Sequence, residues 1–349
     1  MKEKATITDV ANYAKVSKST VSNFLNKKYE KMTEETKKAI SNAIEELDYV
    51  PSLSARRLSA KNISRTICLV IPRNLVYLYD AMYYPTVFKA VGKIAEEVGY
   101  NILIFSRNTT SSNNEIEYLK SLAQSLVDGF IIFDLEKEDF YFKEFEKLNI
   151  PYICVGKILD YEDYPYVASD HKQSMKEMLK YLLDLGHRRI GIIAEHMSSV
   201  VEISRVKALE EFLEENPEEI IDCDYTHIPL KISEKEILDK CQEMFVKEDH
   251  PSAVIVSSTF LNPCVQAIES QGLMIPEDVS VIAFEYYEDG KNNGYKNVTK
   301  VASKADQISR IAFKKLIDYI EHPQNKIVSH LEKLSLTEGE TTSALNKNA

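Results

Sequence analysis

The sequence predicts two fold classes in one chain of 349 residues: a small all-α helix-turn-helix domain, followed by a two-lobed α/β domain. Charge supports this division, because residues 1–62 contain 12 basic and 8 acidic side chains while the rest of the chain contains 31 and 46. Periodicity supports it as well. Apolar residues recur at helical spacing in the first 50 residues, and short apolar runs alternate with amphipathic segments from about residue 63 onward.

The composition is that of an ordinary globular protein, with 44% hydrophobic and 28% charged residues. No apolar run reaches the roughly 18 residues of a membrane-spanning helix, and the first residues lack the apolar core of a signal peptide. The five cysteines form no CxxC pair, which indicates reduced thiols. We therefore expect a cytoplasmic protein. Its net charge of −11 argues against nucleic-acid binding only if the charge is averaged along the chain.

Three short helices are expected in the head, which we place at residues 1–49. Their apolar stripes are Ile7, Val10, Ala11 and Ala14, then Val21, Phe24 and Leu25, then Ile40, Ala43, Ile44 and Leu47. Ser17 or Ser19 can cap the second helix, and Thr33 can cap the third. Two short helices joined by a tight turn and followed by a third form a helix-turn-helix unit, although a generic three-helix packing module remains an alternative.

The second helix of such a unit lies in the major groove of DNA. Its outward side here is short and polar, with Lys18, Ser19, Ser22 and Asn23. These groups can donate hydrogen bonds to phosphates and base edges. A polyanion partner for the head alone is consistent with the basic charge of this segment.

Residues 50–62 separate the head from the body, and two interpretations of this segment stay open. It is either a plain linker or a short helix whose exposed Leu58, next to Arg56 and Arg57, acts as a minor-groove wedge. A helix this short is marginal in water on its own.

The body, residues 63–349, is expected to contain parallel sheets covered by helices on both faces. The expected strands are 66–71, 101–105, 129–133, 152–155, 190–194, 253–257 and 280–284, and the expected helices are 85–98, 115–126, 172–185, 202–215, 233–247, 262–270 and 305–320. Lobe 1 would cover about 63–166 and 296–328, and lobe 2 about 167–295 and 329–349. A ligand cleft is expected at the carboxyl ends of the strands. After Glu338 the chain is polar, and we expect it to fray.

Several motifs resemble those of LacI/GalR-family transcription regulators. They are residues 6–11 (TITDVA), 16–22 (VSKSTVS), 25–26 (LN), 44–51 (IEELDYVP), 55–58 (ARRL), 185–190 (LGHRRI) and 275–284 (IPEDVSVIAF). The resemblance implies a hinge helix and an effector domain with the fold of periplasmic sugar-binding proteins. The sequence departs from the family in three places. Lys15 replaces a Gly in the helix-turn-helix turn, Asn23 replaces a common Arg, and Ser52 replaces an Asn.

The resemblance also implies roles for individual residues on DNA. Lys18, Ser19 and Asn23 would read bases, whereas Thr6, Thr20, Ser22 and Asn26 would anchor phosphates. Ala55 and Leu58 belong to the implied hinge helix, in which the paired leucines of a dimer intercalate. The expected partners are thus a near-palindromic operator and a second copy of the chain.

The effector-binding residues carried over from the resemblance are Tyr83, Tyr84, Arg205, Thr259 and Glu285. Arg205 would bind effector oxygens, with a surface Arg on an acidic helix as the alternative. Tyr83 and Tyr84 are either a stacking floor or core tyrosines. Glu285 stands at the position of a common Asp, and Thr259 replaces another. The loss of that Asp beside a retained Arg205 favours a sugar acid or sugar phosphate as effector.

The sequence contains no phosphate-binding, zinc-protease or serine-hydrolase motif, so no metal, cofactor or enzymatic activity is expected. The predicted function is sequence-specific DNA-binding transcription regulation. Within this class, we expect a repressor of sugar or sugar-acid metabolism genes that is controlled by a small effector in the cleft between the lobes. The alternative is a cytoplasmic sugar-binding or sugar-processing protein without DNA function, which would leave the basic head unexplained.

Overall fold

The computed structural model describes residues 5–25, 28–30, 32–50, 63–72, 82–107, 112–133, 141–157, 164–195, 200–220, 222–229, 232–246, 248–286 and 294–345. Its contacts group into two compact units, residues 1–66 with 117–128, and the rest of the chain. Among the described residues, no helix is both long and apolar enough to cross a membrane.

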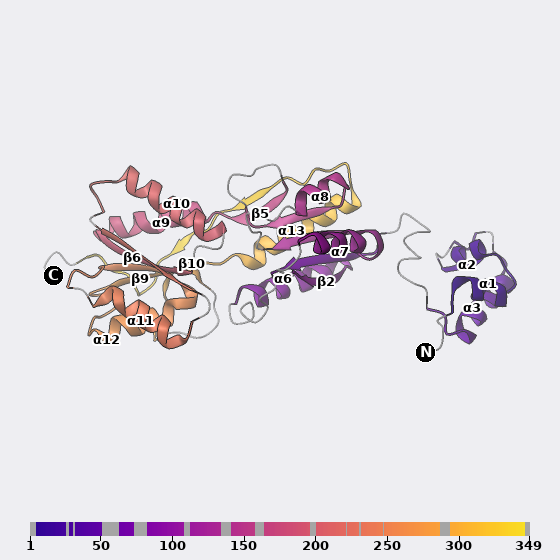
Figure 1. Ribbon diagram of the computed structural model, residues 1–349, viewed down its shortest axis with the longest axis horizontal. Helices are drawn as coiled ribbons and strands as arrows, with labels where there is room; N and C mark the ends of the chain where they lie inside the picture. The colour runs from indigo at the N-terminus through magenta and orange to yellow at the C-terminus, as the bar shows by residue number, and fades with distance from the viewer. Residues whose placement is uncertain are drawn as a thin grey trace. The chain divides into compact units, whose positions relative to one another are not determined.

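The head folds as three short helices around a small apolar core (Figure 1). They are α1 (Ile7–Tyr13), α2 (Lys18–Leu25) and α3 (Glu34–Glu46). The buried core consists of Val10, Ala11, Val21, Ile40, Ala43 and Tyr49. Apart from Tyr49, which follows α3, these residues come from the apolar stripes of all three helices, which confirms the helices predicted from the sequence.

Local hydrogen bonds start each helix of the head. Thr6 and Asp9 form a reciprocal capping box on α1, in which the Asp9 backbone N–H donates to Thr6 Oγ1 at 3.4 Å and the Thr6 backbone N–H donates to Asp9 Oδ2 at 2.8 Å. Ser17 caps α2, because its Oγ accepts from the backbone N–H of Thr20 at 3.1 Å. Thr33 caps α3 as expected.

The turn between α1 and α2 accepts a side chain at the position where a glycine was expected. Lys15 has a φ of 52°, in the left-handed region that disfavours L-residues with a Cβ. The Val16 backbone N–H donates to the Ala11 carbonyl at 3.0 Å, which closes the end of α1 around this residue.

The body contains two six-stranded sheets. In order, sheet A consists of β11 (His330–Glu332), β5 (Tyr166–Ser169), β4 (Tyr152–Val155), β3 (Gly129–Phe133), β1 (Thr66–Ile71) and β2 (Asn101–Ser106). Sheet B consists of β12 (Leu336–Thr337), β10 (Thr299–Ala302), β9 (Ser280–Tyr286), β8 (Ala253–Ser257), β6 (Arg189–Glu195) and β7 (Asp222–Ile228). In sheet B all neighbouring strands are parallel except β10 and β12.

Helices supply the apolar cover of both sheets. The helices of the body are α6 (Tyr83–Val98), α7 (Ser112–Ser125), α8 (Tyr141–Lys147), α9 (His171–Asp184), α10 (Val200–Glu215), α11 (Glu234–Phe245), the short 3-10 helix Ser258–Phe260, α12 (Leu261–Ser270) and α13 (Ala305–Glu321). α6 and α13 pack into the core of sheet A. α9 and α10 cover one face of sheet B, and α11 and α12 cover the other (Figure 1). This is the doubly covered parallel sheet that the sequence predicts.

The strand order corrects the predicted boundaries of the lobes. We assigned 167–169 and 329–332 to lobe 2, but β5 and β11 belong to sheet A, where His330 pairs with Val167. We assigned 296–302 to lobe 1, but β10 pairs with β9 in sheet B. The chain therefore passes from one sheet to the other after β5, after β10 and after β11. These short strands lack the continuous apolar runs by which the longer ones were recognised.

The prediction that the chain frays after Glu338 is wrong. Thr341 is only 2% exposed, and its hydroxyl donates to the Val281 carbonyl at 2.7 Å. The same hydroxyl oxygen accepts from the Thr299 backbone N–H at 2.9 Å. The Leu345 backbone N–H donates to the Leu185 carbonyl at 2.9 Å. The polar residues Thr341, Thr342 and Ser343 hydrogen-bond to strands of sheet B, so the polar composition of this segment does not indicate fraying.

Candidate nucleic-acid interface and ligand site

One face of α2 is polar and exposed, while the opposite face packs into the core of the head. Lys18, Ser19 and Asn23 are exposed and Ser22 is half-buried, whereas Val21 is fully buried. Spacings of one, four and five residues place the four polar side chains on the same side of a helix. An ammonium, two hydroxyls and an amide on one short surface can together reach phosphates and base edges.

Other predicted phosphate contacts are engaged in local hydrogen bonds. Thr6 Oγ1 donates to Asp9 Oδ2 at 2.7 Å, and this contact lowers the pKa of the Asp9 carboxyl. Ser17 Oγ lies 2.7 Å from Ser19 Oγ and 2.8 Å from Thr20 Oγ1. Each of these hydroxyls must give up or share its local bond to contact DNA. Asn26, Ala55 and Leu58 lie outside the described residues.

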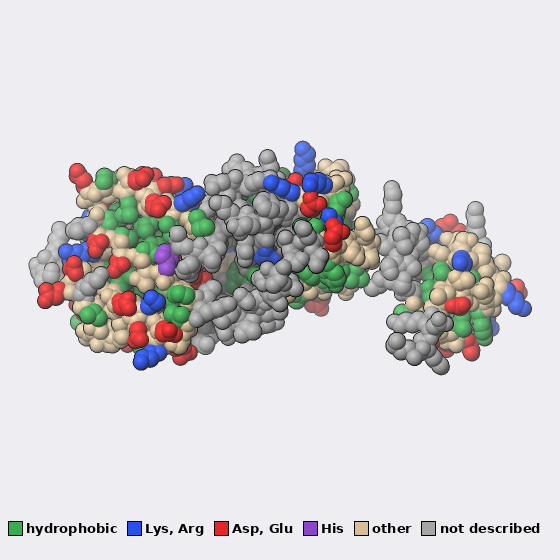
Figure 2. All heavy atoms as spheres, in the orientation of Figure 1, with side chains coloured by type: hydrophobic (Ala, Val, Ile, Leu, Met, Phe, Trp, Pro, Cys, Tyr) green, Lys and Arg blue, Asp and Glu red, His purple; other side chains and the backbone are tan. Residues whose placement is uncertain are grey.

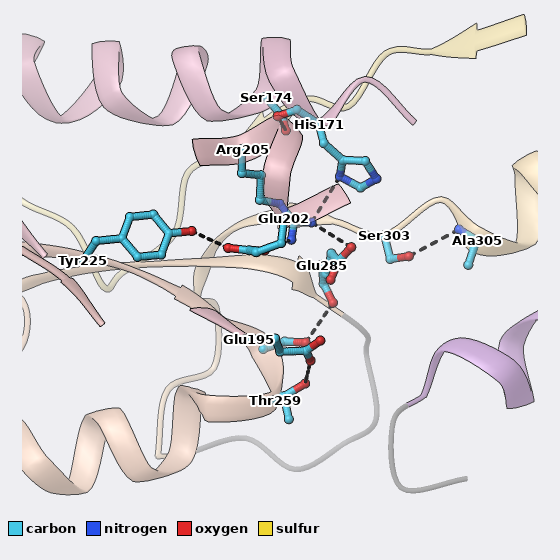
Figure 3. A network of polar contacts seen from close by, with 11 residues as sticks. His171, Ser174, Glu195, Glu202, Arg205, Tyr225, Thr259, Glu285, Ser303 and Ala305 are labelled. Carbon is cyan, nitrogen blue, oxygen red and sulfur yellow. Dashed lines mark hydrogen bonds and ion pairs between the residues drawn. The ribbon is translucent and has the colours of Figure 1, made fainter. Parts of the chain in front are cut away.

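The second candidate site surrounds Arg205 of α10, which is 4% exposed (Figure 3). Its Nη1 lies 2.9 Å from Glu202 Oε2, and its Nη2 lies 2.7 Å from Glu285 Oε1. The guanidinium carbon lies 4.3 Å from the centre of the Phe284 ring. Arg205 is therefore paired at both ends of its fork and covered on one face.

His171 and Glu285 complete the surroundings of this guanidinium. Arg205 Nη2 donates to His171 Nδ1 at 3.1 Å, so the imidazole is a neutral acceptor. Burial, together with the charge of Arg205, lowers the pKa of His171 to about 3. Burial raises the pKa of Glu285, but the charge of Arg205, the effect of His171 and the hydrogen bond from Arg205 together more than offset this, so its pKa lies below the usual value.

A further carboxylate lies at the end of β6. Glu195 Oε1 accepts from Thr259 Oγ1 at 3.3 Å (Figure 3). Ser258 Oγ donates to the Glu285 carbonyl at 2.8 Å. Burial, and next the charge of Glu285, raise the pKa of Glu195 to about 7. On the other side of the cluster, the Tyr225 hydroxyl donates to Glu202. The predicted residues Arg205, Glu285 and Thr259 are thus brought together in lobe 2.

The two predicted tyrosines occupy different environments. Tyr84 is 1% exposed, and its ring packs against Phe88 and Phe133 in the core of sheet A. Tyr84 is therefore a core tyrosine and not part of a stacking floor, which corrects the prediction that it contacts an effector. Tyr83 is half-buried, with its ring edge-on to Tyr84 at 5.0 Å between centroids.

No cluster of metal-binding side chains occurs in the part of the chain that the structure describes. All five cysteines are free thiols. Acidic side chains are spread over the surface of lobe 2 on the face shown in Figure 2, which does not favour a polyanion there.

Comparison with known proteins identifies the family. Residues 6–52 match the model "Bacterial regulatory proteins, lacI family", and residues 179–342 match a periplasmic-binding-protein-like domain. The ribose operon repressor of Halalkalibacterium halodurans is 30% identical over 321 residues, which cover 90% of each chain. The chain belongs to the LacI family. It is therefore a transcription regulator with a helix-turn-helix DNA-binding domain.

Other LacI-family proteins resemble the chain over nearly its full length. The transcriptional repressor PurR of Escherichia coli is 29% identical and covers 96% of this chain and 98% of its own. Among solved structures, the lac repressor dimer bound to operator has a TM-score of 0.75 at 21% identity and covers 98% of this chain and 100% of its own. The CelR–cellobiose complex has a TM-score of 0.68 at 22% identity, covering 97% and 99%. These structures confirm the predicted combination of folds.

Sequence reasoning missed several members of the Arg205 cluster in this LacI-family protein. Glu202 precedes Arg205 by three residues on one helix, a spacing that brings side chains together and offered a signal. Glu195 directly follows the apolar run of β6, at the end of the sheet where ligands bind. Tyr225 lies on β7, which was not predicted as a strand, and His171 had no distinguishing pattern.

Proposed function

We propose that this LacI-family protein is a repressor that binds a near-palindromic operator as a homodimer and responds to a small effector. The observation that carries the DNA-binding part is the exposed polar face of α2, with Lys18, Ser19 and Asn23 as base-reading residues. The hydroxyls of Thr6, Thr20 and Ser22, together with Asn26, are proposed phosphate contacts. Leu58 is the proposed minor-groove wedge, and Ala55 belongs to the same proposed hinge helix.

The effector part is supported by the Arg205 cluster. Its side chains come from the ends of β6 and β9, from the segment after β8 and from α10, so they gather at the carboxyl ends of parallel strands. One relative is named a ribose operon repressor, and the regulator CelR was solved in complex with cellobiose. Both names favour a sugar-like effector for this chain. An effector controls DNA binding only if it binds two states of the protein with different affinity.

We further propose that the protein acts in the cytoplasm without enzymatic activity or a cofactor. Its action would depend on binding alone. Lobe closure around the effector would change the spacing of the two heads of the dimer, and operator affinity would change with it.

The direct test is selection of bound duplexes from a random-sequence library by the full-length protein. We expect enrichment of a near-palindromic motif, and loss of that motif with the double variant Lys18→Ala/Asn23→Ala. Asn42→Ala, an exposed change on α3, is the matched control and should select the same motif. The absence of any enriched sequence, combined with a sugar-induced rise in melting temperature, would instead support a sugar-binding protein without DNA function.

A further inference from the structure

The guanidinium of Arg205 is already neutralised by the protein itself. Its two ends pair with Glu202 and Glu285 at 2.9 and 2.7 Å, and its Nη2 also reaches His171. An effector carboxylate or phosphate would have to displace one of these carboxylates to use the fork. Displacement of Glu202 would leave a buried, uncompensated negative charge, and a displaced Glu285 would remain beside the incoming anion and repel it.

The electrostatic balance around Arg205 is negative. Glu195, Glu202 and Glu285 face this single guanidinium, and His171 is neutral. Glu202 is enclosed, with a side chain 2% exposed, whereas the Glu285 side chain is 32% exposed. The accessible carboxylates of the cluster are therefore those of Glu195 and Glu285, at the ends of β6 and β9, and their oxygens accept hydrogen bonds.

We propose that the effector presents hydrogen-bond donors, hydroxyl or ammonium groups, to Glu285 and Glu195, and that these two residues exclude anionic ligands. Arg205 is then a positioning residue that holds Glu285, not the residue that binds effector oxygens. This inference rests on the proposed function of the cluster as the effector site. It replaces the expectation of a sugar acid or sugar phosphate that the sequence suggested.

Two further observations agree with this assignment. Burial and the charge of Glu285 already raise the pKa of Glu195, which means that the site disfavours a further negative charge even on its own side chain. The backbone carbonyl of Glu285 accepts from Ser258 Oγ, and its carboxylate pairs with Arg205 at 2.7 Å, so both parts of the residue are held before any ligand arrives. A preformed acceptor pair suits a ligand whose donors are fixed on a rigid ring.

The test uses the full-length protein and ligand sets that share a skeleton but differ in charge. Each set contains a neutral sugar, its amino derivative, its carboxylate and its phosphate, built on ribose, glucose and cellobiose. A thermal-shift screen is followed by calorimetric titration of each compound that raises the melting temperature. We expect the neutral or amino member to bind at least about 30-fold more tightly than the carboxylate and phosphate of the same skeleton.

Variants connect this preference to the named residues. Glu195→Gln should reduce the discrimination against anions by about tenfold, while Glu210→Gln, an exposed change on α10, should leave it as it is. A carboxylate or phosphate as the tightest ligand would overturn the inference. The absence of binding by every member of every set would instead count against the proposed effector site.

Discussion

His187 and Ser343 are joined by a partly buried hydrogen bond that connects the turn before β6 to the segment around Ser343. The Ser343 carbonyl can only accept, so His187 Nε2–H donates to it, at 3.0 Å. His187 Nδ1 lies 3.0 Å from Ser252 Oγ. The imidazole is 2% exposed, and its burial lowers its pKa despite the favourable Ser343 contact.

This contact predicts a stability loss in acid. Because the pKa of His187 is lower in the folded state, the unfolded chain takes up the proton first as the pH falls below about 6.5. The free energy of unfolding should therefore decrease between pH 7 and pH 5. In His187→Gln this part of the decrease should disappear, as measured by urea unfolding at several pH values. Parallel pH profiles for the two proteins would contradict the prediction.

Arg205 is expected to be a strong determinant of the stability of lobe 2. Replacement with Met leaves Glu202 and Glu285 without their shared cation, and the expected loss is about 3 kcal/mol. Lys207→Met, an exposed change on the same helix, is the control and should cost under about 0.5 kcal/mol. Chemical unfolding monitored in the far ultraviolet measures both. Equal effects of the two substitutions would show that the pairing of Arg205 adds little.

The left-handed Lys15 predicts a stabilising substitution in the head. Lys15→Gly removes the Cβ penalty at a φ of 52° and should stabilise the head by about 0.5–1 kcal/mol. Lys38→Gly, in the interior of α3, should instead destabilise the head by a similar amount. Hydrogen exchange of the head amides in the full chain reports both changes. A loss of protection in Lys15→Gly would contradict the strain argument.

Asn23 tests whether α2 reads bases. Asn23→Ala should relax the preference at one position of each half-site, at a cost of about 1–3 kcal/mol for the preferred base. The dependence of affinity on salt should stay the same, because no phosphate contact is removed. Binding-site selection and salt titration provide the two readouts. An unchanged selected motif would exclude Asn23 as a base reader.

Glu195 gives a pH prediction of the opposite sign to His187. Its pKa of about 7 means that the folded state keeps a proton that the unfolded chain releases near pH 4.5. Stability should therefore fall as the pH rises through this window. Glu195→Gln should raise the free energy of unfolding by about 2 kcal/mol at pH 8 and by little at pH 4.

The groups that set this titration lie on several elements. Glu285, Arg205, Glu202 and Thr259 act on the Glu195 carboxyl, and His227 Nδ1 lies 3.2 Å from the Glu195 carbonyl. Glu210→Gln is the control. A gain in stability from Glu195→Gln that is the same at both pH values would point to packing and not to charge.

The sequence predicted those parts of the fold that depend on local pattern. The apolar runs of β1, β3 and β8 and the stripes of the three head helices each identify their own element, because a buried surface needs a matching period. Lys15 was correctly expected to place a side chain in the helix-turn-helix turn. Strand β7 was missed because its alternating polar residues, DCDYTHI, resemble a loop.

The candidate ligand site was predictable only in part. Arg205 and Glu285 were named, but they are 80 positions apart, and only the tertiary fold shows that one neutralises the other. The same holds for Glu195, whose environment depends on residues from three other segments. The inferred charge of the effector was reversed for this reason. A cation in a sequence does not reveal whether its partner is a ligand or the protein.

The three points at which the chain passes from one sheet to the other also determine when the domain can finish folding during synthesis. β11 completes the edge of sheet A at residues 330–332, and β12 with the segment around Thr341 completes sheet B. Each of these two edge strands therefore follows every other strand of its sheet along the chain. A nascent chain that has reached residue 328 contains neither β11 nor β12, so this domain cannot finish folding until residues 330–341 have been synthesised. A fusion placed directly after residue 345 would lie next to the segment that completes the edge of sheet B, and it should therefore interfere with the last step of folding.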